Sequence, residues 1–385
     1  MTNRERAMAI LKYAPCDRIP IVHFGFWNET LQKWHTEGHI SFEQARDWSD
    51  CTPIDKQIGD KLGFDFGWYN CFSPATGLWP VFEEKVLEEL PDGTQKVLDC
   101  NGAIVLRKAG AGSIPAEVDH LLKNRQAWQE HYLFRLQFDA SRVTAASVNT
   151  GLEFKPFTQG GLEFLKKQER SNPIGLYCGS LFGQIRNWIG VENISYMYMD
   201  DEPLYDEIIN TVGELCYKCT ETALSSGAKF DFAHFWEDIC FKNGPLVIPS
   251  VFAQKVGPHY KRITDLVSKH GIEIISLDCD GLIDSLIPIW LENGVNTMFP
   301  IEVGTWDANI RPWRQHYGKN LRGVGGMNKV VFSGDYAAID VEIERLKPLV
   351  ELGGYIPCPD HRIAPDAKWE NVQYYCEKMR KAFTE

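Results

Sequence analysis

Short apolar runs, each bounded by glycine, proline or polar residues, recur along the chain and have the length of buried β-strands. They cover residues 18–24, 64–68, 174–178, 230–235, 272–278, 295–301, 321–325 and 354–358. Between most of them, apolar residues repeat at helical spacing over 203–225, 249–270, 282–293, 310–317 and 341–352. Such alternation implies parallel strands joined by crossover helices. The sequence therefore predicts an α/β fold, a single (β/α)8 TIM barrel closed by these strands.

One region departs from this alternation and has the pattern of an antiparallel β-meander. Residues 81–90, 95–99 and 103–108 resemble strands, and Asp92-Gly93 between the first two is a strong turn signal. A helical pattern over 116–141 follows. We therefore predict an inserted meander and helix at about 80–141, lying over the catalytic mouth between the second and third barrel strands. Since no repeat or flexible linker interrupts the sequence, residues 1–385 are expected to form one domain.

The composition argues against several classes of partner. The formal net charge of −12 disfavours nucleic acid, because phosphate binding requires a basic surface. No apolar run reaches membrane-spanning length, and residues 1–11 are too polar for a signal peptide. The eleven cysteines lack the spacing of a disulfide framework. We expect a cytoplasmic protein with reduced thiols.

Polar clusters follow two of the predicted strands, at the point where each strand ends. Asp278 and Asp280 end the strand over 272–278, and His361 follows the strand over 354–358. The carboxyl ends of barrel strands are where such folds hold their chemistry, so an enzyme is favoured over a binding module. Because strand side chains alternate, both aspartates are expected to face the mouth, whereas Ile275, Leu277 and Cys279 face the outer helices.

Two aspartates and a histidine from a neighbouring strand can bind a divalent cation. Catalytic zinc takes three protein ligands and keeps one open position. Asp278, Asp280 and His361 are therefore candidate ligands, and Glu237, at the end of the fourth strand, is a candidate fourth ligand or proton donor. Simpler alternatives remain open: Asp280 as the cap of a helix near 282, His361 as a loop partner of Asp360, and Glu237 in a rim salt bridge.

Aromatic and charged residues at other strand ends are candidates for binding a substrate. Each has packing or charge neutralisation as its alternative; for Glu302 the alternative is an ion pair with Lys329. The candidates are His23, Trp27, Tyr177, Arg186, Trp236 and Glu302.

Four groups of these residues together resemble one known superfamily. They are Trp236-Glu237-Asp238 with 242–246, Asp278-Cys279-Asp280-Gly281 with 290–296, Pro300-Ile301-Glu302-Val303, and 353–357 with Pro359-Asp360-His361. The combination resembles the uroporphyrinogen decarboxylase superfamily, and more closely its cobalamin-dependent methyltransferase branch. The resemblance covers nearly the whole chain and implies a single (β/α)8 barrel.

The chain departs from two patterns within that superfamily. True decarboxylases carry Arg-Gln-Ala-Gly-Arg after the first strand to grip porphyrinogen carboxylates, whereas this chain has Phe-Gly-Phe-Trp-Asn-Glu at 24–29. Methyltransferases that use thiols hold zinc by His-x-Cys and a distant Cys, and the matching positions here are Asp278, Asp280 and His361. Carboxylates make such a site harder, which suits an oxygen-bearing substrate such as a methyl ether.

The resemblance implies methyl transfer from a small methoxylated, aromatic substrate to the Co(I) corrinoid of a partner protein. Zn²⁺ held by Asp278, Asp280 and His361, with Glu237 as a candidate fourth ligand, would polarise the leaving oxygen. Without metal, His361 or Glu237 would act as general acid. Trp27, Tyr177 and Trp236 are expected to hold the ring, and the meander to receive the corrinoid protein.

Two alternatives remain open at this point. One keeps methyl transfer but changes the substrate to another small methyl donor or to a thiol acceptor. The other is a lyase that decarboxylates a smaller substrate, for which Arg186 is the candidate partner of the substrate carboxylate.

Overall fold

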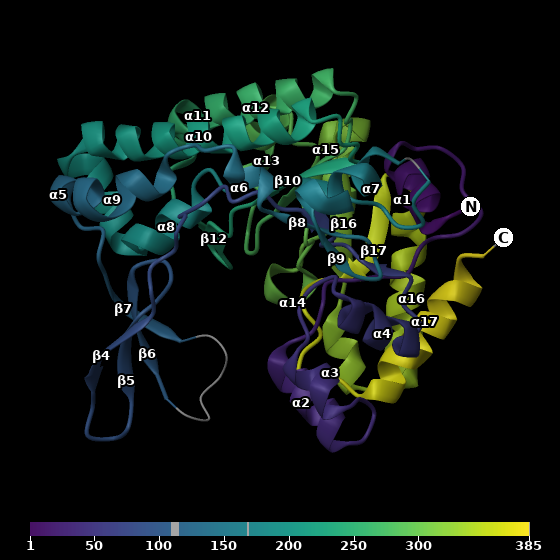
Figure 1. Cartoon of the computed structure of the whole chain (residues 1–385). Helices are drawn as coiled ribbons and strands as arrows, with labels where there is room; N and C mark the ends of the chain where they lie inside the picture. Colours follow the sequence, from purple (N-terminus) through teal and green to yellow (C-terminus); the bar gives the residue numbers. More distant parts are fainter. Residues whose placement is uncertain (109–114, 168, 385) are drawn as a thin grey trace.

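A parallel β-sheet of seven strands forms the centre of the molecule (Figure 1). The computed structural model describes residues 1–108, 115–167 and 169–384. The hydrogen-bonded order of the sheet is β17-β16-β15-β14-β11-β10-β3. Its strands are β3 (Cys71–Phe72), β10 (Gly175–Gly179), β11 (Phe232–Trp236), β14 (Ile275–Asp278), β15 (Thr297–Phe299), β16 (Arg322–Met327) and β17 (Tyr355–Pro359).

A separate parallel pair, β1 (Val22–His23) and β2 (Phe66–Gly67), completes the set of predicted strands. Each of the eight apolar runs contains or overlaps an observed strand. The segments following β1 and β17 are joined by backbone hydrogen bonds from Trp27 N to Ile363 O (3.2 Å) and from Ile363 N to Gly25 O (3.1 Å). The parallel α/β sheet is thus confirmed, but no closed ladder of strands is present in the described part of the chain.

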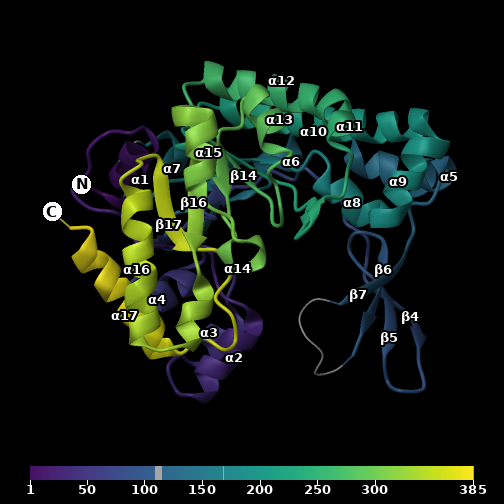
Figure 2. The same cartoon turned by 180° about the vertical axis from the view of Figure 1, so that it is seen from behind.

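Helices surround this sheet in both views of the molecule (Figures 1 and 2). Those between and after the later strands are α10 (Glu202–Ser225), α11 (Pro249–Lys255), α12 (Gly257–Lys269), α13 (Ile287–Glu292), α14 (Val303–Trp306), α15 (Ile310–Tyr317), α16 (Tyr336–Val350) and α17 (Trp369–Ala382). The predicted helix over 249–270 is split into α11 and α12, since Pro258 in the first turn of α12 has no N–H to continue the first helix. None of the described helices combines the length and apolarity needed to cross a bilayer.

The remaining elements are short. The helices are α1 (Asn3–Leu11), α2 (Asn28–Thr36), α3 (Phe42–Arg46), α4 (Pro53–Leu62), α5 (Arg125–Ala127), α6 (Ser141–Thr144), α7 (Leu162–Lys166), α8 (Gly183–Ile189) and α9 (Val191–Asp200). Single turns of other helix types are η1 (Trp128–Tyr132), η2 (Leu133–Leu136), η3 (Phe157–Gly161), η4 (Gly318–Asn320) and η5 (Lys329–Ser333). Two small antiparallel hairpins are β8 (Ser147–Asn149) with β9 (Phe154–Pro156), and β12 (Cys240–Phe241) with β13 (Gly244–Pro245).

An antiparallel sheet projects from the body of the molecule near α8 and α9 (Figures 1 and 2). It consists of β4 (Lys85–Glu89), β5 (Gln95–Leu98), β6 (Ala103–Arg107) and β7 (Ala116–His120), paired in chain order. The first three strands lie where the meander is predicted. The predicted helix over 116–141 is wrong, because residues 116–120 pair with β6 instead and only short turns of helix follow. Strand pairing with a free sheet edge has overridden the helical spacing.

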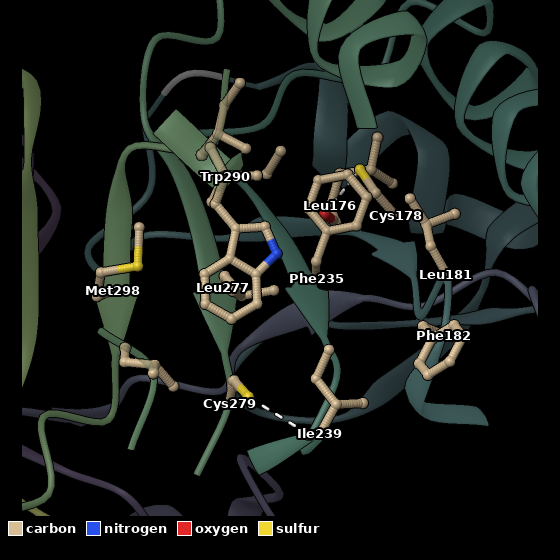
Figure 3. Close-up of a cluster of buried hydrophobic side chains, with 14 of the residues drawn as sticks. Leu176, Cys178, Leu181, Phe182, Phe235, Ile239, Leu277, Cys279, Trp290 and Met298 are labelled. Carbon is tan, nitrogen blue, oxygen red and sulfur yellow. Dashed lines mark hydrogen bonds between the residues drawn. The ribbon is translucent and has the colours of Figure 1, made fainter. Parts of the chain in front are cut away.

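The two faces of the parallel sheet carry different cores. Outward-facing side chains from β10, β11, β14 and β15 pack beneath the surrounding helices with Trp290 of α13 (Figure 3). Ile275, Leu277 and Cys279 belong to this outer core, as predicted. The inner core contains Val22, Phe24, Phe66, Trp68, Phe232, Ile274, Phe299, Val324, Ile356 and Cys358. Side chains alternating with the outer set, including that of Asp278, therefore face inward.

Candidate functional site

Carboxyl groups gather at the carboxyl ends of β11, β14 and β15. Asp238, Asp278 and Glu302 are each influenced by the charge of Asp280. Burial is the main cause that raises the pKa of all three, and Asp280 raises each of them further. For Asp278 the rise is large, so this carboxyl keeps its proton well above the usual range for aspartate. We call Asp238, Asp278, Asp280 and Glu302 the acidic cluster.

Asp280 and His361 meet in this cluster, as the sequence predicts. The Nε2 atom of His361 lies 3.2 Å from Oδ2 of Asp280, and Oδ1 of the same carboxylate is buried without a hydrogen-bond partner. The ring of Trp27 stacks on that of His361, with centroids 5.4 Å apart and planes 14° from parallel. The alternative of a capping role for Asp280 is not supported, because α13 begins only at Ile287.

Asp278 is held by a residue that sequence reasoning missed. Its side chain is 3% exposed, and Oδ2 accepts a hydrogen bond from the hydroxyl of Tyr69. Tyr69 lies between the short strands β2 and β3, at the carboxyl end of the second predicted strand. This position could have identified Tyr69 as a candidate, because the functional residues of such folds lie at the carboxyl ends of strands.

An aromatic cavity adjoins the acidic cluster through Tyr69. It measures about 310 Å³ and is lined by Tyr69, Cys71, Ser73, Tyr177, His234 and Trp236. Tyr177 and Trp236 are thus two predicted substrate-binding residues that share one cavity. His234 was not singled out by the sequence, because a histidine inside an apolar strand resembles packing. The cavity has the aromatic lining that typifies small-molecule sites.

Glu237 lies outside both groups, although it was predicted as a ligand or an acid. Its fully buried carboxylate accepts hydrogen bonds from the backbone of Leu181 (2.8 Å), Phe182 (2.9 Å) and Gly183 (2.6 Å) at the start of α8. It also accepts from the hydroxyls of Ser180 (3.1 Å) and Tyr260. A carboxylate so fully engaged anchors a helix N-terminus, where negative charge is favourable, and has no lone pair left for a metal.

His23 is also displaced from the predicted role. Its ring packs on the outer side of β1 against Phe26 and Phe64, with centroids 5.3 Å and 4.9 Å away. Nε2 lies 3.7 Å from Oδ2 of Asp55, and Nδ1 accepts a hydrogen bond from the backbone of Gly25. The residue next along the chain, Phe24, faces the inner core instead. His23 is therefore a packed residue and not a part of the aromatic cavity.

Arg186 and Glu302 lie at the rim but are engaged by the protein. Nη2 of Arg186 donates to the backbone oxygen (2.9 Å) and to Oδ2 (3.0 Å) of Asp238. Glu302 accepts hydrogen bonds from the backbone of Gly281 and from the hydroxyl of Thr305. Lys329 is near enough to Glu302 to be influenced by its charge, but burial dominates and lowers the pKa of the lysine.

The predicted zinc ligands do not converge in this arrangement. Within residues 1–108, 115–167 and 169–384, no three His, Cys, Asp or Glu side chains are grouped so that they could hold a metal ion. Asp280 and His361 contact each other, whereas Asp278 is directed at Tyr69. The residues as they stand do not fit a site with three protein ligands, and zinc stays a prediction.

Comparison with known proteins finds similarity among solved structures. No protein-family profile matches the sequence, and no curated protein sequence matches it. Among solved structures, a methyltransferase from Methanosarcina mazei is similar, with a TM-score of 0.61 and 14% sequence identity. The match covers 99% of this chain and 98% of that one. The two chains share a fold.

Proposed function

We propose that this protein is a methyltransferase that removes a methyl group from a methoxylated aromatic substrate and passes it to the Co(I) corrinoid of a partner protein. The observation that carries the proposal is the aromatic cavity beside carboxyl groups whose pKa is raised. The likeness to a solved methyltransferase over the full chain supports it. The proposal assumes that the fold is a (β/α)8 barrel. In that barrel β2 and β3 would belong to one strand.

The chemical difficulty lies in the leaving oxygen. When the methyl C–O bond breaks, the electron pair stays on oxygen, and a phenol has a pKa of about 10. Proton donation as the bond breaks makes this oxygen a better leaving group, an effect worth about 10²- to 10⁴-fold. The corrinoid supplies the nucleophile that accepts the methyl group.

Asp278 is the residue of this chain best placed to hold that proton. Burial and the charge of Asp280 raise its pKa well above the ordinary aspartate value, so it holds its proton more readily than an exposed aspartate does. Its carboxyl shares a hydrogen bond with the Tyr69 hydroxyl, and Tyr69 lines the cavity. In the reaction the direction of this hydrogen bond reverses: Tyr69 gives its hydroxyl proton to an oxygen held in the cavity and takes a proton from the Asp278 carboxyl, which is left as a carboxylate. Tyr177 and Trp236 position the substrate ring.

An absorbance experiment under anoxic conditions tests the proposal. The protein is mixed with Co(I) corrinoid, free or bound to a corrinoid protein, and with a panel of methoxylated aromatics, methanol and methylamines. We expect loss of the Co(I) band and growth of methylated corrinoid with methoxylated aromatics. The Asp278→Asn variant should slow this change, whereas Asp265→Asn, at an exposed position on α12, should not.

The result that contradicts the proposal is equally definite. If a corrinoid preparation competent with another methyltransferase shows no change with any donor, the favoured substrates are wrong. The lyase alternative would then need a free cation for the substrate carboxylate, although Arg186 is already paired with Asp238.

A further inference from the structure

His234 presents two unpaired nitrogens inside an otherwise aromatic environment. The side chain is 1% exposed, and neither Nδ1 nor Nε2 has a hydrogen-bond partner among the described residues. Its ring contacts that of Tyr69 in a T-shaped arrangement, with centroids 5.3 Å apart. A buried polar group without a partner destabilises the folded state. The presence of an unpaired imidazole at the wall of a cavity is explained if a bound ligand forms hydrogen bonds with its nitrogens.

A second unpaired group lies beside it on the next strand. Ser276 of β14 is in register with His234 of β11, is fully buried, and its hydroxyl has no hydrogen-bond partner. Both side chains face the inner side of the sheet. The two unpaired polar groups therefore lie at the same level on neighbouring strands, and His234 lines the cavity.

The charge of the cavity restricts what it can bind. Burial lowers the pKa of His234 to about 3, so its imidazole is neutral and offers one donor and one acceptor. No lining residue carries a positive charge. Arg362 acts on Asp278 and Tyr69 at the rim, but its guanidinium is paired with Asp50, and the other charged groups that act on Asp278 are acidic. A hydroxyl can both donate to and accept from a neutral imidazole. A ring carboxylate can only accept, and its burial without a cation is costly.

We infer that His234 is a specificity-determining residue that hydrogen-bonds a phenolic hydroxyl of the substrate, which makes the substrates uncharged methoxyphenols and not methoxylated ring carboxylates. The inference rests on the proposed function, because it names the substrate class of the same cavity. His234 thus hydrogen-bonds the phenolic hydroxyl, while Asp278 and Tyr69 act at the methoxy oxygen.

Binding measured by calorimetry without corrinoid tests this directly. The ligands are guaiacol (ortho-methoxyphenol), anisole, which lacks the hydroxyl, and vanillate, which adds a ring carboxylate to guaiacol. One hydrogen bond of about 1.4 kcal/mol corresponds to a factor of about ten in affinity. We expect the wild-type protein to bind guaiacol about tenfold or more tightly than either of the other two ligands.

Variants connect that preference to His234. His234→Phe should bind guaiacol and anisole equally, because it keeps a ring but removes both nitrogens. His234→Gln keeps a donor and an acceptor and should retain part of the preference. His131→Phe, at a half-buried position on η1 away from the cavity lining, is the matched control and should behave as wild type.

The outcomes separate this inference from the proposed function. Equal wild-type affinities for guaiacol and anisole, tighter binding of vanillate, or an unchanged preference in His234→Phe would overturn the role of His234. Absence of binding by all three ligands would overturn both proposals. A preference that depends on His234, without methyl transfer to Co(I) corrinoid, would support the inference and contradict only the proposed function.

Discussion

Nε2 of His361 lies 3.2 Å from Oδ2 of Asp280, and this one carboxylate influences the protonation of three acids around it, Asp238, Asp278 and Glu302. Asp280→Asn preserves the shape of the side chain but removes its negative charge. The pKa of Asp278 should then fall, because the charge that disfavoured its ionisation is gone. We predict that the alkaline limb of the kcat profile moves to lower pH. An unchanged profile would show that Asp278 does not supply the proton; Asp265→Asn serves as the control.

Asp278→Asn separates stability from activity. The folded-state pKa of Asp278 is raised, so as pH rises above the unfolded value of 3.8 the unfolded chain releases this proton first and stability is lost. The asparagine variant does not suffer that loss. It should melt at a higher temperature than wild type near neutral pH, with the difference disappearing below 3.8. Methyl transfer should fall by about 10²-fold or more, because the proton donor is missing.

Thermal unfolding at several pH values checks this prediction, together with the rate assay at neutral pH. A variant that melts below wild type at neutral pH would mean that the hydrogen bond to Tyr69 outweighs the desolvation of the carboxyl.

His234 should make the protein sensitive to moderate acid. Its folded pKa of about 3 lies below the ordinary value of 6.5, so the unfolded chain binds the proton more readily. The contribution of neutral His234 to the free energy of unfolding is therefore fully present above pH 6.5 and is lost as the pH falls toward 3. Between about pH 7.5 and about pH 5, wild type should lose about 2 kcal/mol of unfolding free energy that His234→Phe retains. Urea titrations at the two pH values measure the difference; equal losses would contradict it.

Glu237 should matter for folding before it matters for chemistry. Removing its carboxylate in Glu237→Ala leaves the N-terminal amides of α8 buried without an acceptor, which should cost about 3 to 5 kcal/mol. Gly183→Ala disturbs the same turn through a different contact, because an added Cβ would lie 1.8 Å from the backbone carbonyl oxygen of Glu237. Both variants should unfold at lower urea concentration, whereas the exposed Glu130→Ala should not.

The activity of the folded Glu237→Ala variant distinguishes this structural role from a catalytic role. If Glu237→Ala is as stable as wild type but inactive, the carboxylate takes part in the reaction and its position as a helix anchor has been misjudged.

The strands were predictable because each is a short apolar run that the sheet buries on both faces, as in parallel sheets generally. The alternation of Asp278 with Leu277 and Cys279 gave the correct facing of the acids for the same reason. The helix over 116–141 failed because its apolar spacing fits a helix, while the decisive partner, β6, lies earlier in the chain. Closure of the strands into a barrel depends on contacts that no local pattern contains.

Within the site, strand ends located Asp278, Asp280, His361, Tyr177 and Trp236. Glu237 follows a strand like the others, yet its side chain is directed at the amides that begin α8, which sequence position does not reveal. Tyr69 and His234 were missed for the opposite reason. In the sequence each resembles an ordinary packing residue. Only the structure shows that both line the cavity and that the nitrogens of His234 are unpaired.

The projecting sheet β4–β7 has a core of its own that consists of Val97, Ala103 and Val105, while every residue of β4 is exposed. Few buried apolar contacts give a segment low local stability. We therefore expect this sheet to open and reclose while the parallel sheet stays folded, so that amide hydrogen exchange is faster in β4 than in β14. A part of the chain with such independence can change its sequence without disturbing the protein that carries it.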